Sequence, residues 1–368
     1  MKVNGTPMRT IWPQDADARG IGASVGIIDQ TRLPHDFATL SLTSVDQAAH
    51  AIAAMLVRGA PLIGATAAYG VALAMKFDAS DAGLARVAAQ LAATRPTAIN
   101  LKWALDRVTA ALAPLAEDAR AQAAWAEAAA ICDEDVEINA AIGRHALPLI
   151  EAIAAQKSGP VNILTHCNAG WLATVDRGTA TSPIYFAHDA GISIHVWVDE
   201  TRPRNQGAAL TAWELNRHGV PHSVISDNSG GHLMQRGEVD LIFVGTDRTT
   251  ANGDVCNKIG TYLKALAAKD NGVPFFVCLP SPTIDFALAS GADIPIEERS
   301  ADEITHVHGR DPDGRITTVQ ITPDGSPARN HAFDVTPARL VTGLVTERGI
   351  IEPTRESLAR AFPERSGA

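Results

Sequence analysis

Small apolar residues recur every three or four positions over the first half of the chain, from Val45 to about Ala155. This spacing places them on one face of a helix, so it predicts a series of helices. Residues 1–43 differ, because short β-prone runs such as SVGIIDQ and FATLSLT are separated by Gly and Pro. The pattern therefore predicts a mainly helical N-terminal domain with short β-strands over residues 1–153. Four prolines are expected to interrupt its helices, at positions 61, 96, 114 and 148.

The pattern changes after the segment AAQKSGP (154–160). Short, nearly continuous apolar runs rich in β-branched residues now alternate with helical stretches. These runs are VNILTH, ISIHVWV, HSVIS, DLIFVG and PFFVCLP. Strands that are buried on both faces lose the alternation of apolar and polar residues, so such runs indicate parallel strands of a doubly wound sheet. We expect residues 154–368 to form an α/β domain of this kind.

Composition and charge exclude several classes of protein. The 368 residues carry a formal net charge of -10, which argues against a general nucleic-acid binder and leaves room only for a local basic pocket. No stretch has the length and apolar character of a transmembrane helix, and the N-terminus lacks the apolar core of a signal peptide. We therefore expect a cytoplasmic protein that binds neither nucleic acid nor membrane.

The spacing of potential metal ligands and cysteines excludes further kinds of site. The four cysteines, at positions 132, 167, 256 and 278, are widely separated and form no CxxC pair. This argues against a disulfide framework and against a structural zinc site. No recognised metal-ligand spacing is present, and no GxGxxG motif follows a predicted strand. We expect neither a metal nor a dinucleotide cofactor.

Polar residues and glycines follow four of the predicted strands. VNILTH leads into 167–170, ISIHVWV into 199–207, HSVIS into 227–232 and DLIFVG into 246–248. A doubly wound sheet binds its ligands beyond the carboxyl ends of its strands. A single polar strand end means little, but four together predict a ligand site at this edge of the sheet.

Two residues at these strand ends allow more than one interpretation. Asp247 would be a helix N-cap or a partner of Arg248, or else burial would favour its protonated form and make it a general acid. Cys167 is either a buried core cysteine or a thiol activated by the amides of a helix N-terminus. A dyad of Cys167 with His166 is not expected, because adjacent strand residues point to opposite faces. The sequence leaves both sets of alternatives open.

Residues suited to binding a phosphate stand at three places. In the segment Arg58–Ala60, a Gly and the following Pro either end the preceding helix or complete a phosphate cradle around the guanidinium. Arg95 offers a second guanidinium. Asn257 and Lys258, which we expect at the start of a helix, offer amides and an ammonium. Each alone is more often an ordinary surface charge, so only their assembly in space would make a site.

Longer blocks of the sequence are specific enough to compare with a known family. They are VRGAPLIG (57–64), RPTAINL (95–101), THCNAG (165–170), DETRPRNQGAALTAWEL (199–215), VGTDRTTANGDVCNKIGTY (244–262), IPIEER (294–299) and FDVTPARLVTGLVTERG (333–349). In these blocks the chain resembles the methylthioribose-1-phosphate isomerase family, which is related to the regulatory subunits of the eukaryotic translation-initiation guanine-nucleotide exchange factor. The resemblance implies a Rossmann-like, doubly wound, mostly parallel sheet after the smaller N-terminal domain, and a homodimer.

The resemblance also implies an activity and a set of residues. The activity is an aldose–ketose isomerisation of 5-methylthioribose 1-phosphate to 5-methylthioribulose 1-phosphate in methionine salvage, without cofactor or metal. The alternatives are isomerisation of 5-deoxyribose 1-phosphate or ribose 1,5-bisphosphate, or a non-catalytic regulatory role. The implied catalytic pair is Cys167 and Asp247. The implied substrate contacts are Arg58, Gly59, Ala60, Arg95, Gln206, Asn257 and Lys258.

Two questions stay open at this point. The sequence departs from the family pattern in DNSGGHLM (227–234), in LPSPTID (279–285), at Cys256 and at Trp171, and such changes would reshape the pocket around the sugar's 5-substituent. The reaction also has two candidate routes. Hydrogen moves from C2 to C1 either as a proton through an enediol, with Asp247 opening the ring and Cys167 acting as base, or as a hydride in an apolar pocket.

Overall fold

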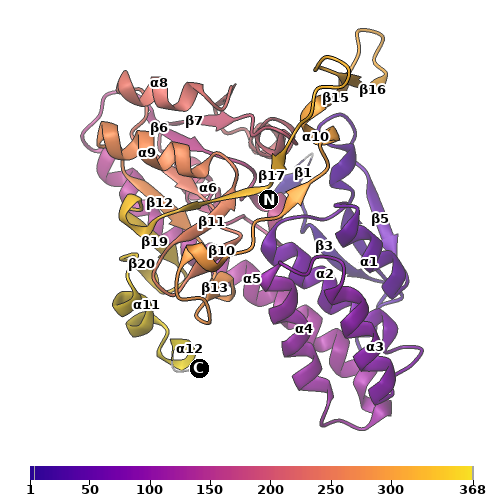
Figure 1. The fold of residues 1–368 in the computed structure, drawn as a ribbon. Helices are drawn as coiled ribbons and strands as arrows, with labels where there is room; N and C mark the ends of the chain where they lie inside the picture. Colours follow the sequence, from indigo (N-terminus) through magenta and orange to yellow (C-terminus); the bar gives the residue numbers. More distant parts are fainter. Residues whose placement is uncertain (4, 367–368) are drawn as a thin grey trace.

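A computed structural model describes residues 1–3 and 5–366 of the chain. The N-terminal part is mainly helical and lies beside a larger α/β part, as predicted (Figure 1). Its strands form a small hairpin and a three-stranded antiparallel sheet of order β3-β4-β5. The elements of this part are β1 (Lys2–Val3), β2 (Thr6–Pro7), β3 (Ile11–Gln14), β4 (Ser24–Ile28), η1 (Gln30–Arg32), β5 (Thr39–Leu42), α1 (Val45–Ala53), α2 (Ala60–Ala74), α3 (Asp81–Ala92), α4 (Ile99–Leu112) and α5 (Glu117–Ala154).

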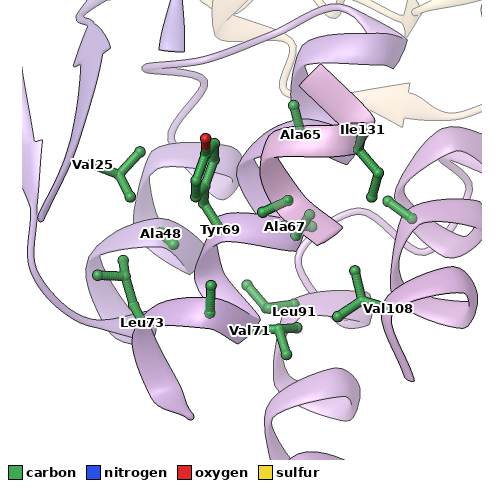
Figure 2. Close-up of a cluster of buried hydrophobic side chains, with 14 of the residues drawn as sticks. Val25, Ala48, Ala65, Ala67, Tyr69, Val71, Leu73, Leu91, Val108 and Ile131 are labelled. Carbon is green, nitrogen blue, oxygen red and sulfur yellow. The ribbon is translucent and has the colours of Figure 1, made fainter. Parts of the chain in front are cut away.

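Helix α2 forms the centre of the N-terminal core. Its residues from Leu62 to Ala74 are all buried, because the surrounding helices and the small sheet cover every face of it. Figure 2 shows part of this cluster, with Tyr69, Val71 and Leu73 of α2 among side chains from neighbouring elements. The many alanines let the helices approach closely, so a helix that is apolar all round is stable here.

Helix α5 belongs to two cores. Ile131 and Cys132 pack in the N-terminal core, whereas Ile142, Ala146 and Ile150 pack against the large sheet. The helix runs through Pro148, which we expected to interrupt it. A proline inside a helix costs about 3 kcal/mol. Full burial of an isoleucine side chain contributes about 1.5–3 kcal/mol, so the residues around Pro148 offset that cost.

The large sheet has the strand order β20-β19-β12-β9-β6-β7-β8 and is parallel except for β20. Numbered along the chain, its parallel strands follow the order 3-2-1-4-5-6 of a Rossmann-type doubly wound sheet, which confirms the predicted fold class. The order reverses between β6 and β9. The strands are β6 (Val161–Thr165), β7 (Ile194–Asp199), β8 (His222–Ile225), β9 (Leu241–Val244), β12 (Phe275–Cys278), β19 (Gly343–Thr346) and β20 (Gly349–Ile351).

Both faces of this sheet are covered, as its apolar strands predicted. Along β6, Ile163 packs into the cluster that includes α5 and α6, and Leu164 packs into the cluster on the other face with α8, α9 and α11. The remaining helices are α6 (Ser182–Asp189), α7 (Ala212–His218), α8 (Ser229–Gln235), α9 (Thr261–Asn271), α10 (Asp302–Thr305), α11 (Arg355–Ala361) and α12 (Pro363–Ser366). Short helical turns are η2 (Trp171–Ala173), η3 (Gly207–Thr211), η4 (Ser281–Thr283), η5 (Gly291–Asp293) and η6 (Ala338–Leu340).

A second, four-stranded sheet of order β13-β10-β11-β18 was not predicted. It consists of β10 (Arg248–Thr250), β11 (Val255–Lys258), β13 (Ile284–Asp285) and β18 (Phe333–Thr336). Asn257 and Lys258 lie on β11, so our expectation that they begin a helix was wrong; α9 begins at Thr261. Small antiparallel pairs complete the fold, namely β14 (Glu298–Arg299) with β17 (Asn330–His331), and β15 (His306–Arg310) with β16 (Ile316–Gln320). Among the described residues, no helix combines the length and apolarity that crossing a bilayer requires.

Candidate active site

A cavity of about 800 Å³ opens where the N-terminal helices meet the carboxyl ends of the large sheet. It is lined by residues from both parts of the chain and from the second sheet. Of the residues singled out from the sequence, the lining includes Arg58, Gly59, Ala60, Arg95, Cys167, Gln206, Asp247 and Lys258, and it does not include Asn257.

Cys167 follows β6 and its backbone is held in an unusual conformation. Its φ is 66°, in the left-handed region that non-glycine residues seldom adopt. The Cys167 N–H donates to the Thr201 hydroxyl at 2.8 Å, and the Thr211 hydroxyl donates to the Cys167 carbonyl at 2.7 Å. No helix begins at this residue, so the explanation of a thiol at a helix N-terminus was wrong. These bonds fix a buried thiol in the wall of the cavity.

Asp247 follows β9, the strand beside β6 at which the strand order reverses. Its N–H donates to the Cys256 carbonyl at 2.9 Å, and strand β10 begins at the next residue, so Asp247 is not a helix N-cap. Within the described chain, Arg248 pairs with Asp285 at 3.3 Å rather than with Asp247. Neither structural explanation of this aspartate holds. Its half-buried carboxyl group lines the same cavity as Cys167.

The segment after Arg58 begins a helix and does not end one. Gly59 is the N-cap of α2 and Pro61 lies in its first turn. The φ of Gly59 is 94°, and a Cβ at this position would lie 2.5 Å from the Cα of Ala173. The first amides of a helix have no partners within it and favour anions. The first turn of α2 therefore presents amides to the cavity, beside the Arg58 side chain.

Arg58 is oriented by a buried chain of hydrogen bonds that the sequence did not reveal. Its guanidinium donates to the Asn168 side-chain oxygen and, at 2.8 Å, to the Asn168 carbonyl. Asn168 in turn donates to the carboxylate of Glu214 at 3.2 Å. Glu214 is fully buried, and it also accepts the N–H groups of Trp171 and Leu172. Burial raises the pKa of Glu214 against the opposing effect of these donors.

Arg95 and Lys258 bring further positive charge to the cavity, although both are largely buried. Burial lowers the pKa of Arg95, whose guanidinium lies 3.6 Å from Glu297. Burial also lowers the pKa of Lys258 to about 8. The Lys258 ammonium lies 4.8 Å from the centroid of the Phe333 ring. Among the described residues, no hydrogen bond satisfies either cation, which is the arrangement expected of a site for an anion.

Gln206 and Asn257 differ in how they meet the cavity. Gln206 immediately precedes η3, and its buried Oε1 atom has no hydrogen-bond partner within the described structure. Asn257 donates its side-chain amide to the Thr261 hydroxyl at 3.0 Å. Since side chains alternate along β11, Cys256 and Lys258 line the cavity and the Asn257 side chain does not. A substrate contact through the backbone of Asn257 stays a prediction.

Three residues behind Cys167 have the spacing of a cation site, namely His166, Asp199 and Asp227. Protein donors contact three of the four carboxylate oxygens of the two aspartates, and Asp199 Oδ1 has no hydrogen-bond partner within the described structure. The Lys264 ammonium lies 3.1 Å from Asp199, and the amides of 201 and 202 each donate to Asp227 at 2.7 Å. We therefore interpret the cluster as a support for the Thr201 backbone rather than as a metal site.

Both ring nitrogens of His166 are occupied away from Cys167. Nδ1 contacts Asp199 at 2.8 Å and Nε2 contacts the carbonyl of Ile259 at 2.8 Å. Because a carbonyl only accepts, Nε2 carries the hydrogen in this arrangement. His166 therefore does not form a dyad with Cys167. The expected reason was wrong, because both residues follow β6, which ends at Thr165, and do not alternate along a strand.

Comparisons with known proteins agree with one another. Residues 56–353 match the model of the "Initiation factor 2 subunit family". The chain is 66% identical to the methylthioribose-1-phosphate isomerase of Paramagnetospirillum magneticum, with 100% of both chains covered. It is 64% identical to that of Rhodospirillum rubrum, covering 100% of this chain and 95% of the relative.

Two solved structures resemble the whole fold. The crystal structure of 5-methylthioribose 1-phosphate isomerase from Pyrococcus horikoshii OT3 superposes with a TM-score of 0.82 at 40% identity, covering 97% of this chain and 96% of that one. Translation initiation factor eIF-2B, subunit delta, from A. fulgidus gives a TM-score of 0.79 at 36% identity, covering 97% and 100%. The shared fold thus extends over nearly the full length of all three chains.

Proposed function

Since this chain belongs to the initiation factor 2 subunit family, and to the methylthioribose-1-phosphate isomerases within it, we propose that it converts 5-methylthioribose 1-phosphate into 5-methylthioribulose 1-phosphate. The reaction is an aldose–ketose isomerisation and would serve methionine salvage. One observation carries the proposal. A single cavity joins Cys167 and Asp247, at the point where the strand order reverses, to a cluster of buried cations suited to a phosphate.

The phosphate would bind at the cationic end of the cavity. Arg58, Arg95 and Lys258 would supply charge-assisted hydrogen bonds, and the first amides of α2, at Gly59 and Ala60, would complete the cradle. Gln206, with its free side-chain oxygen, would accept a hydrogen bond from a sugar hydroxyl. The sugar would then extend from the phosphate towards the two sheet-edge residues.

Asp247 and Cys167 would perform the chemistry. The phosphate ester on C1 prevents spontaneous ring opening, so Asp247 would give a proton to the ring oxygen as the C1–O4 bond breaks. Cys167 would take the proton from C2, which forms a C1–C2 double bond. Proton return to C1 and loss of the hydroxyl proton at C2 give the ketose. Each such acid–base step contributes about 10²–10⁴-fold to the rate. Neither group requires a cofactor.

A hydride shift is the alternative route through the same groups. The hydrogen on C2 would move to C1 with its electron pair, and the C2 hydroxyl would lose its proton to become the carbonyl. Reaction in deuterated water separates the routes, since the enediol route incorporates deuterium at C1 and a direct hydride shift does not.

The activity test follows ketose formation by NMR, with purified protein and 5-methylthioribose 1-phosphate. We expect conversion by the wild type, and a loss of at least about a hundredfold in Cys167→Ser and in Asp247→Asn. Both variants should bind the substrate nearly as well as the wild type. If a folded wild type fails, the related pentose 1-phosphates come next, and failure with all of them would favour the regulatory role suggested by the likeness to eIF-2B delta.

We also propose that the protein works as a cytoplasmic homodimer. All four cysteines are free and buried, which suits a reducing compartment. Analytical ultracentrifugation at micromolar concentration tests the assembly, and a monomer at that concentration would contradict it.

A further inference from the structure

Arg299 lies beside the predicted phosphate residues. It is the last residue of the block IPIEER, to which the sequence analysis gave no role. It lines the cavity and its side chain is only 9% exposed. Its Nε and Nη2 atoms donate to the two carboxylate oxygens of Glu297 at 2.9 and 3.1 Å. The Nη1 group has no hydrogen-bond partner among the described residues. The guanidinium is therefore held firmly along one edge and keeps free donors on the other.

The ring of Phe333 supports this guanidinium from a second side. The Cζ atom of Arg299 lies 5.5 Å from the ring centroid, and the Lys258 ammonium lies 4.8 Å from the same centroid. Phe333 and Lys258 are register partners on β18 and β11, so the sheet itself sets their separation. A ring in contact with two cations attracts both by cation–π interaction and brings their charges close together.

The charges around Arg299 do not balance. Glu297 serves two arginines, since it also lies 3.6 Å from Arg95. Arg58, Arg95, Lys258 and Arg299 give four positive charges. Glu297 gives one negative charge, and the proposed mechanism requires one more from Cys167, with Asp247 protonated, so two positive charges are uncompensated. A phosphate monoester carries about −1.5 to −2 at neutral pH, which matches that surplus.

The other two arginines of the cavity provide the contrast. Arg204 lies 2.7 Å from Glu303, and Arg248 lies 3.3 Å from Asp285. Each therefore has a carboxylate partner of its own, although Glu303 also interacts electrostatically with Arg299. These two pairs add no net charge, so the surplus belongs to the group of cations around Arg299.

We propose that Arg299 is a further ligand of the substrate's phosphate, with its free Nη1 edge donating to a phosphate oxygen while Glu297 and Phe333 hold it in place. The inference rests on the proposed function, because it names one more contact for the same substrate. It also applies to inorganic phosphate, which allows the site to be tested without the sugar.

The experiment compares Arg299→Met with a matched change, Arg329→Met, in the full-length protein. Arg329, the residue before β17, makes a similar two-point contact with Glu298 of β14, but its side chain is 74% exposed and does not line the cavity. Binding of inorganic phosphate is measured by calorimetry, and KM and kcat are measured with 5-methylthioribose 1-phosphate. We expect Arg299→Met to weaken phosphate binding and raise KM by about ten- to a hundredfold, and Arg329→Met to change neither.

Two further measurements separate binding from structure. In Arg299→Ala, added ethylguanidinium should restore part of kcat/KM, which a merely structural loss would not allow. Should the Met variant not fold, Arg299→Lys keeps the charge and should still weaken phosphate binding at least about threefold, because an ammonium lacks the planar fork. Wild-type phosphate affinity in a folded Arg299 variant would overturn the inference. Phosphate binding without turnover by the wild type would instead overturn the proposed function.

Discussion

Lys258 shows how one side chain can be prepared for an anion before the anion arrives. Burial lowers its pKa to about 8. The positive charges of Arg299 and Arg58 lower this pKa further, whereas the electrostatic effect of Cys167 and Asp247 raises it. An ammonium in these surroundings is unfavourable until a negative charge enters. A bound phosphate supplies that charge and raises the pKa again, so binding energy is available from relieving the repulsion. The same reasoning applies to Arg95, whose pKa burial also lowers.

Phosphate binding should therefore weaken as the pH rises above about 8. Over that range Lys258 loses its proton in the empty cavity, and binding must return it. Calorimetry with inorganic phosphate at pH 7 and pH 9.5 measures the change and the proton uptake. In Lys258→Met affinity should be lower at pH 7, and it should not fall above pH 8, where the charge of phosphate itself no longer changes. An unchanged slope in that variant would assign the titration to another group.

The same pKa shift affects folding stability in the opposite direction, because the free energy of unfolding of the anion-free protein should rise with pH. In the unfolded chain this lysine keeps its usual pKa of about 10.4, so between pH 8 and that value the unfolded state binds more protons than the folded state. Lys258 therefore lowers the free energy of unfolding of the anion-free protein below pH 8. This destabilisation disappears as the pH rises from 8 to about 10.4. Added phosphate should remove the effect.

At the scale of elements, the strands that carry Cys167 and Asp247 were predictable and those that carry the cations were not. VNILTH and DLIFVG are continuous apolar runs because both of their faces are buried. In contrast, β11 reads VCNK, which has no strand pattern of its own. It is a strand because it pairs with β18, whose residues are more than 70 positions away in the chain. Such pairing depends on the whole fold, and so the second sheet was missed.

The start of α2 is another element whose function depends on distant residues. Gly59 approaches Ala173 so closely that any side chain there would collide with its backbone. That contact places the first turn of α2 against the loop that follows β6, and thus sets the distance between the phosphate cradle and Cys167. From the sequence, the same glycine read equally well as the end of the preceding helix.

Gly59→Ala should disrupt both the fold and the site. Its φ of 94° is unfavourable for alanine, at a cost of about 1–3 kcal/mol, and the collision with Ala173 adds to this. Gly191→Ala is the control, because Gly191 also has a positive φ, of 77°, but no atom lies within 4 Å of the added Cβ. Urea unfolding should show a larger loss for Gly59→Ala, and only that variant should raise KM. Equal losses would mean that the contact with Ala173 relaxes easily.

At the scale of the whole molecule, α5 joins the two parts more closely than the predicted boundary at residues 153 and 154 suggests. Its first half completes the N-terminal core and its second half covers the large sheet. The N-terminal amino group adds a second link, since it pairs with Asp176 at 2.8 Å. The cavity lies between the parts, so a rigid connection keeps Arg58 and Arg95 in place relative to Asp247. We infer that the two parts unfold together.

Ile150→Ala tests this coupling. Ile150 lies on α5 within the predicted N-terminal domain, yet its fully buried side chain packs against the large sheet. Its removal should cost about 2–5 kcal/mol and shift one cooperative transition. The control, Ile316→Ala, removes a side chain that is 46% exposed on β16 and should stay within about 0.5 kcal/mol of the wild type. Because α5 serves both cores, fluorescence and far-UV circular dichroism should give the same midpoint in urea for Ile150→Ala. Two separate transitions, only one of them displaced by the substitution, would instead mean that the parts fold independently and that the cavity is free to open between them.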